Sequence, residues 1–250
     1  MSLEACAGQV ERGDPDRFLA VMAAPPAART RLFPLYAFNL EVARAPQVTR
    51  EPTIAEIRLT WWREALEEIA AGGAVRQHEV VVPLALAIPP ELAARVTALL
   101  DDLIVVRHLD IDKVQFGSGA ALMDYLDRSA GNLLWAAALL LGARPDQEAA
   151  LRAHGRAQGL ANWLMAAPAL RASGWEPLPE GAADFSGLAQ EALTALAQAA
   201  GVRNPALLAA WQAKPLLKQA LRQPEAVFQG GLGQSEFARR FGLLRRSLIG

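Results

Sequence analysis

The sequence predicts an all-α protein, with one domain spanning residues 1–250. Alanine and leucine dominate the chain, and runs of β-branched residues, which favour strands, are scarce. Apolar residues recur with helical rather than alternating spacing, most clearly over residues 54–69. Hydrophobic residues make up 52% of the chain, which is enough to form the core of one large helical domain.

The first predicted helices have clear boundary signals. Asp14 followed by Pro15 is typical of an N-cap and a first helical position, and predicts a helix that ends near Met22. A second helix is expected over residues 26–48, kinked or restarted at Pro34 because proline cannot donate a backbone hydrogen bond.

The next helix is expected between a capping-box spacing at Thr53–Glu56 and the Gly72-Gly73 pair. Its apolar residues follow one helical face, which we expect to pack on the core. They are Ile54, Ile57, Trp61, Trp62, Ala65, Leu66 and Ile69.

The remainder is expected to be helical apart from one irregular stretch. Residues 80–88 include three consecutive valines that alone would suit a strand, but their surroundings favour a helix. Three longer helices are expected, over residues 90–110, 118–141 and 146–167. Glycine and proline predict irregular structure over residues 170–187, and the last helix is expected from Ser235. Three prolines are expected to break the segment between them: Pro205, Pro215 and Pro224.

Composition excludes several classes of protein. A net charge of −1 argues against nucleic acid as a partner. The single cysteine, Cys6, cannot form a disulfide within the chain, and no apolar signal-peptide region follows Met1. Residues 130–143 are apolar but too short to span a bilayer, so they predict a buried helix. We therefore expect a cytoplasmic protein, at most peripheral at the inner membrane.

Six short motifs occur along the chain in a familiar order. They are Asp16-Arg17-Phe18, Tyr36-Ala37-Phe38, Trp61-Trp62-Arg63, Tyr125 with Ala130-Gly131, the pattern Gly155-x-Ala157-x-x-Leu160-x-Asn162, and Leu178-Pro179. Together, at these spacings, they resemble the squalene/phytoene synthase family over nearly the whole chain. The resemblance implies a helical bundle of the isoprenoid synthase type around a central cavity.

The residues that would hold metal in this family are missing. Active members carry a D-x-x-x-D pair in each of two motif helices, and the matching positions here are Ala43, Gln47, Ala166 and Leu170. Magnesium needs oxygen ligands, mostly carboxylates, to neutralise a departing diphosphate. Trp175 and Pro177 also replace the arginine and tyrosine of the family's G-R-x-Y-L-P motif. We therefore expect no catalytic residue and no cofactor, with magnesium bound only if transferase activity survives.

A closer likeness exists within the family. Residues 37–41, 156–159 and 164–168 resemble a branch of mitochondrial complex I assembly factors that also lack the aspartate pairs. This implies a pseudoenzyme with an assembly role in bacteria that have a related respiratory complex, and with respiratory-complex subunits or other assembly factors as partners. Two alternatives are a prenyl-diphosphate transferase with a divergent site, in which Glu41 is the nearest carboxylate, and a lipid carrier or sensor.

Polar residues on the two motif helices are the candidate site. If both helices face one cavity, these residues would lie along its mouth: Tyr36, Asn39, Glu41, Arg44, Gln158, Asn162 and Trp163. Glu41 and Arg44 are spaced to pair with each other. An internal hydrogen-bond network in place of the metal clamp is favoured over binding of a lipid or isoprenoid head group. Four tryptophans could line the apolar part: Trp61, Trp62, Trp135 and Trp163.

The C-terminal helix is amphipathic and basic. Its apolar residues Phe237, Phe241, Leu244 and Leu248 share one side, and Arg239, Arg240, Arg245 and Arg246 lie largely elsewhere. Such a helix can lie on an anionic membrane or dock on the core with its arginines in water. Docking is favoured, because the family uses late helices to close the bundle.

Overall fold

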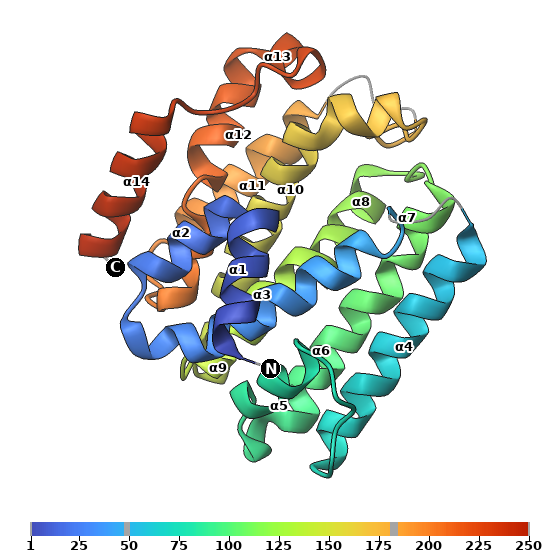
Figure 1. The fold of residues 1–250 in the computed structure, drawn as a ribbon. Coiled ribbons are helices and arrows are strands. Elements are labelled where there is room, and N and C mark those ends of the chain that lie inside the picture. The colour runs from blue at the N-terminus through green and yellow to red at the C-terminus, as the bar shows by residue number, and fades with distance from the viewer. Residues whose placement is uncertain (1, 48–50, 181–184, 250) are drawn as a thin grey trace.

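The computed structural model describes residues 2–47, 51–180 and 185–249, which form a helical bundle (Figure 1). These residues contain no strand, so the predicted all-α class is confirmed. The core has two apolar clusters. The larger joins the N-terminal helices to Trp135 and its neighbours, and the smaller surrounds Trp163 and Leu216.

The N-terminal part begins with one helix more than the sequence predicted. Its helices are α1 (Leu3–Gly13), α2 (Pro15–Ala23), α3 (Arg29–Arg44), α4 (Pro52–Ala71), α5 (Val81–Ala87), α6 (Ala93–Val106) and α7 (His108–Asp112). Asp14 caps α2 as predicted, since its Oδ1 accepts a hydrogen bond from the Arg17 amide at 2.9 Å. Helix α1 has no counterpart among the predicted helices, although Ser2 caps it through the Ala5 amide.

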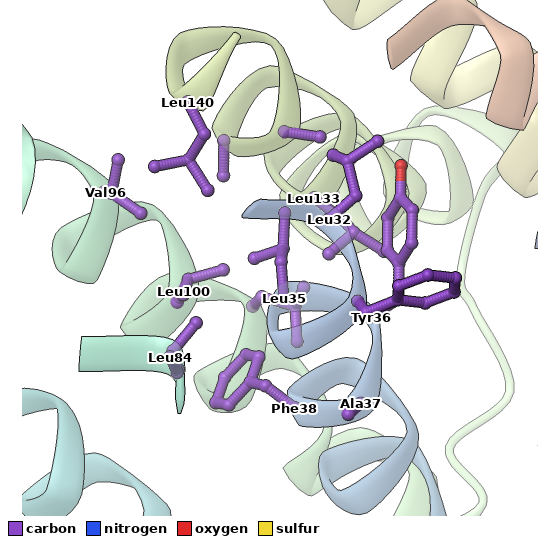
Figure 2. Packing of buried hydrophobic residues seen from close by; sticks show 14 of the residues in the cluster. Leu32, Leu35, Tyr36, Ala37, Phe38, Leu84, Val96, Leu100, Leu133 and Leu140 are labelled. Carbon is purple, nitrogen blue, oxygen red and sulfur yellow. The ribbon is translucent and has the colours of Figure 1, made fainter. Parts of the chain in front are cut away.

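Helix α3 lies in the core along most of its length. The predicted helix begins later than expected, after a 3-10 turn at Pro26–Ala28, and Pro34 is buried inside it. The expected end near Val48 lies outside the described residues. Leu35, Tyr36 and Phe38 of this helix are buried among side chains of α5, α6 and α9 (Figure 2).

Helix α4 differs in detail from its prediction. Its N-cap is Glu51 with Pro52 at the first helical position, so the proposed capping box at Thr53 is wrong. Gly72, at φ 69°, ends the helix as predicted. Trp62, Ala65, Leu66 and Ile69 are buried as predicted. Ile54 and Ile57 are instead 39% and 61% exposed, and Ala55 and Leu59 complete the buried face.

The ambiguous segment 80–88 forms α5, which confirms the helical interpretation. The predicted helix 90–110 is divided into α6 and α7 by a turn at Arg107. No single helix of the described chain is long and apolar enough to cross a bilayer. Helix α5 and residues 90–112 together have sufficient length and apolarity, but the chain bends by 96° between them.

A π turn interrupts the predicted helix 118–141. Ser118 caps α8 (Gly119–Leu126) as predicted, and a π turn at Asp127–Gly131 leads into α9 (Asn132–Leu140). Gly142, at φ 81°, follows the end of α9. A π turn contains one residue more than a turn of α-helix. In this π turn, the Asp127 carboxylate faces α10 and accepts hydrogen bonds from two of its arginines.

The C-terminal part is built around one long helix. Its helices are α10 (Glu148–Ala172), α11 (Ser186–Gln198), α12 (Ala213–Arg222), α13 (Pro224–Gln229) and α14 (Glu236–Ile249), with a 3-10 segment, η5 (Pro205–Ala210), before α12. Helix α10 continues past its predicted end, with Pro168 inside it, and so takes up part of the stretch expected to be irregular. Residues 181–184 of that stretch lie outside the described chain. Pro215 lies in the first turn of α12 and does not break it.

Helix α10 crosses the π turn at very short range, where it has glycine. A methyl group on Gly155 would lie 2.7 Å from the Ala130 carbonyl oxygen and 2.8 Å from the Gly131 Cα. One turn later, a methyl on Gly159 would lie 2.8 Å from the Ala130 Cβ. The two helices can therefore approach this closely only because Gly155 and Gly159 have no side chain.

A buried polar cluster joins α6, α7 and α8. The Arg107 guanidinium donates to Asp110 at 2.9 Å and to the Tyr125 hydroxyl at 2.8 Å, and this hydroxyl donates to Asp110 at 2.7 Å. Burial raises the pKa of Tyr125 well above its ordinary value, although Arg107 opposes the shift. The arginine and aspartate side chains are 20% and 11% exposed, so removal of either would leave a charge in a poorly solvated place.

His154 of α10 makes stability sensitive to acid. Burial lowers the pKa of His154 to about 4, and the nearby Arg246 acts in the same direction. The unfolded chain therefore binds a proton below about pH 6.5 that the folded chain does not bind until about pH 4. We expect the free energy of unfolding to fall by about 2 kcal/mol between pH 8 and pH 5 through this residue. In urea unfolding, the His154→Gln variant should not show this fall in the free energy of unfolding. If stability changed with pH equally in both proteins, His154 would not be its cause.

Candidate functional site

Three predicted candidate residues meet in one small pocket. Tyr36 of α3 and Gln158 and Asn162 of α10 line it, and Leu133 and Leu134 of α9 form its apolar wall. Helix α9 packs against both α3 and α10 and so lies between the two motif helices. In Figure 2 the Tyr36 ring lies beside Leu133. The pocket has a volume of about 20 Å³.

A cation lies over the tyrosine. The Arg17 guanidinium is 5.0 Å from the centre of the Tyr36 ring and is held by Asp14 at 2.8 Å. Burial raises the pKa of Tyr36 to about 12, against the opposing effect of Arg17. The Tyr36 hydroxyl and Gln158 Oε1 are buried and have no hydrogen-bond partner within the described chain. Gln158 Nε2 donates to Asn162 Oδ1 at 2.7 Å, which gives one link of the hydrogen-bond network that the sequence favoured.

The size and lining of the pocket limit its chemistry. Its 20 Å³ can hold about one water molecule, whereas pockets for small-molecule ligands usually measure about 300–1,000 Å³. No carboxylate lines it, and no group of three or more His, Cys, Asp or Glu residues in the described chain could hold a metal ion. Among the described residues, the lining of this pocket includes no carboxylate that could bind magnesium, and its volume is smaller than that of a prenyl chain.

The first pair of former metal positions has also lost its geometry. Gln47 is exposed and follows the end of α3 at Arg44, so it does not share a helix face with Ala43. Ala166 and Leu170 remain in helical register on α10, and both are partly buried.

The other predicted candidates do not line this pocket. Asn39 is buried on α3. Glu41 makes an ion pair with Arg58 of α4 at 4.0 Å, which replaces the predicted pairing with Arg44. Arg44 lies against α1, since a methyl on Gly13 would be 2.7 Å from its guanidinium.

Trp163 belongs to the second core cluster. Its indole Nε1 donates to the Pro177 carbonyl at 2.7 Å, and its ring packs edge-on against Trp175 at 5.0 Å. Both replacements of the family's G-R-x-Y-L-P motif therefore serve to fix the position of Trp163. Of the tryptophans considered as cavity walls, none lines the pocket between the motif helices.

Sequence reasoning missed Arg17 as a site residue, although its Asp-Arg-Phe motif marked it. Two carboxylates, Asp127 and Asp102, make ion pairs with arginines of α10 and of the π turn. Asp127 binds Arg152 at 2.8 Å and Arg156 at 3.2 Å. Asp102 makes an ion pair with Arg128 and accepts a hydrogen bond from Asn132 at 2.8 Å. Burial acts to raise the pKa of Asp102, but Arg128 and Asn132 together hold this pKa below its ordinary value. These carboxylates are therefore committed to ion pairs between helices.

Comparison with solved structures places the fold. The crystal structure of a dehydrosqualene synthase in complex with ligand superposes with a TM-score of 0.81 at 17% sequence identity, covering 99% of this chain and 95% of that one. At this identity the likeness establishes the fold alone.

Relatives found by sequence similarity are named as assembly factors. "NADH dehydrogenase (ubiquinone) complex I, assembly factor 6" of Homo sapiens is 25% identical over 164 residues, which cover 65% of this chain and 48% of the relative. The Bos taurus protein of the same name is 25% identical over 216 residues, covering 86% of this chain and 64% of the relative. The chain thus spans about half the length of the human protein and under two thirds of the bovine one.

The family model for squalene/phytoene synthase matches residues 10–238, which include both motif helices and the pocket between them. The match extends over most of the chain and agrees with the structural superposition. This chain therefore belongs to the squalene/phytoene synthase family.

Proposed function

We propose that this protein is a non-catalytic member of its family that acts in the assembly of a respiratory complex of the complex I type. It would act through contacts with subunits or other assembly factors, without a metal cofactor. We place it in the cytoplasm, at most peripheral at the inner membrane. The names of the human and bovine relatives support the process, and the geometry between α3 and α10 supports the absence of catalysis.

The small volume of the pocket between α3 and α10 is the observation that carries the proposal. An active site for prenyl diphosphates needs both metal ligands and a long hollow for the hydrocarbon. Here the four former ligand positions have no carboxylate, and the pocket measures about 20 Å³. Loss of the ligands alone could reflect a changed metal site, but loss of the space as well favours abandonment of the reaction.

The transferase alternative would need carboxylates from elsewhere. Glu41, its nearest candidate, is directed to Arg58 and does not line the pocket. An isoprenoid carrier that used this hollow would also need more room than one water molecule occupies. The geometry therefore favours protein interaction as the role of this scaffold.

Turnover measurements test the absence of catalysis. We expect purified protein with magnesium and farnesyl or geranylgeranyl diphosphate to show no condensation above background. The A43D/Q47D/A166D/L170D variant restores the acidic residues without restoring the space, and should also be inactive. Diphosphate release at enzymatic rates by the unmodified protein would refute the proposal.

Gene deletion tests the assembly role. Membranes of the deletion strain should contain less fully assembled NADH:quinone oxidoreductase on native gels, with stalled subcomplexes in its place. Expression of either the wild-type gene or the four-aspartate variant should restore assembly if catalysis is not involved. Normal levels of the complex in the deletion strain would overturn this role, whatever the turnover assay shows.

A further inference from the structure

Helix α14 docks on the bundle through a narrow face. Leu243 is buried, and a methyl on Gly242 would contact the Trp211 ring at 3.9 Å. Arg239 makes an ion pair with Asp16 of α2. In Figure 1 the helix forms the outer edge of the molecule, reached by an extended connection from α13. It is therefore fixed to the bundle, as the docking prediction required, but by a face that the sequence did not indicate.

The apolar stripe of α14 is left uncovered. The four residues expected to dock are exposed to different degrees: Phe237 79%, Phe241 56%, Leu244 56% and Leu248 78%. At 3.6 residues per turn they fall within an arc of about 60°, whose centre lies about 130° around the helix from Leu243. Phe237 and Phe241 stack on each other, with ring centres 6.0 Å apart. A contiguous exposed stripe of this kind indicates a contact surface, whereas isolated exposed apolar residues do not.

A basic groove lies along one flank of the stripe, between α14 and α12. It has a volume of about 460 Å³. Its lining includes Lys214, Lys218, Arg245 and Arg246, with the aromatic rings of Trp211 and Phe241. No acidic residue belongs to this lining among the residues the structure describes. Phe241 therefore belongs both to the groove and to the exposed stripe.

The cations of this groove are available to an external anion. No ion pair joins Lys214, Lys218 or Arg245 to another residue within the described ranges. An adjoining open hollow shares Lys218 and adds Arg222. His154 also lines the groove, and its buried Nε2 has no hydrogen-bond partner in the described chain. The groove thus presents several positive charges and an unused polar atom beside two aromatic rings.

This combination matches the chemistry of an anionic phospholipid surface. Lysine and arginine near a membrane are attracted to lipid phosphates, while phenylalanine and leucine of an amphipathic helix enter the boundary between headgroups and acyl chains. Arg245 lies on one flank of the stripe, where its long side chain can reach headgroups as the apolar residues insert. Arg240, on the other flank, makes an ion pair with Glu236 of the same helix. A soluble phosphate compound would use the cations but would leave the stripe uncovered.

We propose that α14 and the α12–α14 groove dock on an anionic phospholipid membrane, with a headgroup phosphate held among Lys214, Lys218 and Arg245. The site is separate from the pocket between α3 and α10, and no residue is shared by the two linings except Ala210. The proposal does not depend on the assembly role.

Vesicle flotation of the full-length protein tests it. The protein should float with vesicles of equal parts phosphatidylglycerol and phosphatidylcholine, and much less with phosphatidylcholine alone. The K214Q/K218Q variant should bind the mixed vesicles roughly thirtyfold more weakly, since each basic residue near the surface contributes about 1 kcal/mol and 1.4 kcal/mol is tenfold. The F237S/F241S variant should bind the mixed vesicles about tenfold more weakly or worse, because it no longer inserts two phenylalanine rings into the membrane. High salt should weaken binding of the wild-type protein.

Matched controls separate this face from general surface effects. Arg12→Gln removes an exposed charge from α1, and Leu86→Ser removes a side chain that is 80% exposed on α5. Neither should change flotation. All six altered positions are exposed, so circular dichroism should show an unchanged fold.

Three outcomes would overturn the proposal. They are equal flotation with neutral and anionic vesicles, equal losses in the controls and the groove variants, and calorimetric binding of inorganic phosphate or pyrophosphate with no flotation. The last outcome would show that the groove is a site for a soluble anion.

Discussion

The Gly155→Ala variant is expected to be destabilised by about 3 kcal/mol, at the upper end of the usual range for overpacking. The added methyl would lie 2.7 Å from the Ala130 carbonyl oxygen and 2.8 Å from the Gly131 Cα. Both contacts are with backbone of the π turn, which cannot rotate away as a side chain would. Helix α10 would have to shift, and its ion pairs with Asp127 would shift with it. Urea unfolding followed by circular dichroism measures the effect.

Gly8→Ala is the matched control, since Gly8 is also a helical glycine. A methyl there would meet only the flexible end of Arg12, at 3.3 Å. This variant should be more stable than wild type by about 0.5–1 kcal/mol, because alanine loses less backbone freedom on folding. Similar stability changes at the two positions would show that α10 and the π turn do not pack this closely in solution.

Arg107→Met should have a comparable or larger effect, with a loss of about 3–5 kcal/mol. It removes the cation from the cluster with Asp110 and Tyr125 and leaves the Asp110 carboxylate, only 11% exposed, without its counter-charge. Tyr125→Phe removes one hydrogen-bonding hydroxyl and no charge, and should lose about 1 kcal/mol. Thermal and denaturant unfolding of both variants would give the order of the two losses.

Arg144→Met provides a surface comparison for this cluster. Arg144 and Asp146 form an ion pair whose side chains are 68% and 65% exposed, and such pairs contribute little. Its unfolding midpoint should match that of wild type. If Arg107→Met were as stable as this control, the cluster would not be buried in solution.

Local signals in the sequence predicted several helix starts and ends, because a cap or a left-handed glycine acts within one turn. Asp14 and Ser118 both cap their helices through backbone amides three residues ahead. Gly72 and Gly142 follow helix ends at positive φ. These interactions require no knowledge of the rest of the fold.

Features that depend on packing between helices were not predictable in this way. The π turn at 127–131 positions Asp127 for two arginines of α10, which no local pattern reveals. The buried face of α4 passes through Ala55 and Leu59 in place of the more apolar Ile54 and Ile57. Similarly, the apolar side of α14 points outward because Leu243 and Arg239 make the contacts with the bundle.

The candidate site was only partly accessible from the sequence. Motif spacing brought Tyr36, Gln158 and Asn162 into consideration, and the structure places all three on one pocket. The volume of that pocket could not be read from the motifs, because it is set by Leu133 and Leu134 on a helix between them. The absence of the aspartate pairs can be read from the motifs, whereas the small volume of the pocket is visible only in three dimensions.

The small volume of the pocket between α3 and α10 has a consequence for how this protein can change during evolution. A pocket that admits a prenyl diphosphate has to keep a hollow of about 300 Å³ or more, and the side chains around such a hollow lose packing contacts. With only about 20 Å³ left open between α3 and α10, the side chains of this chain keep most of those contacts. The stability so retained can absorb destabilising substitutions on the outer surface, where new contacts evolve. Prenyl transfer in this chain would require a hollow to be opened between α3 and α10 as well as four aspartates to be introduced, and two such changes rarely arise together.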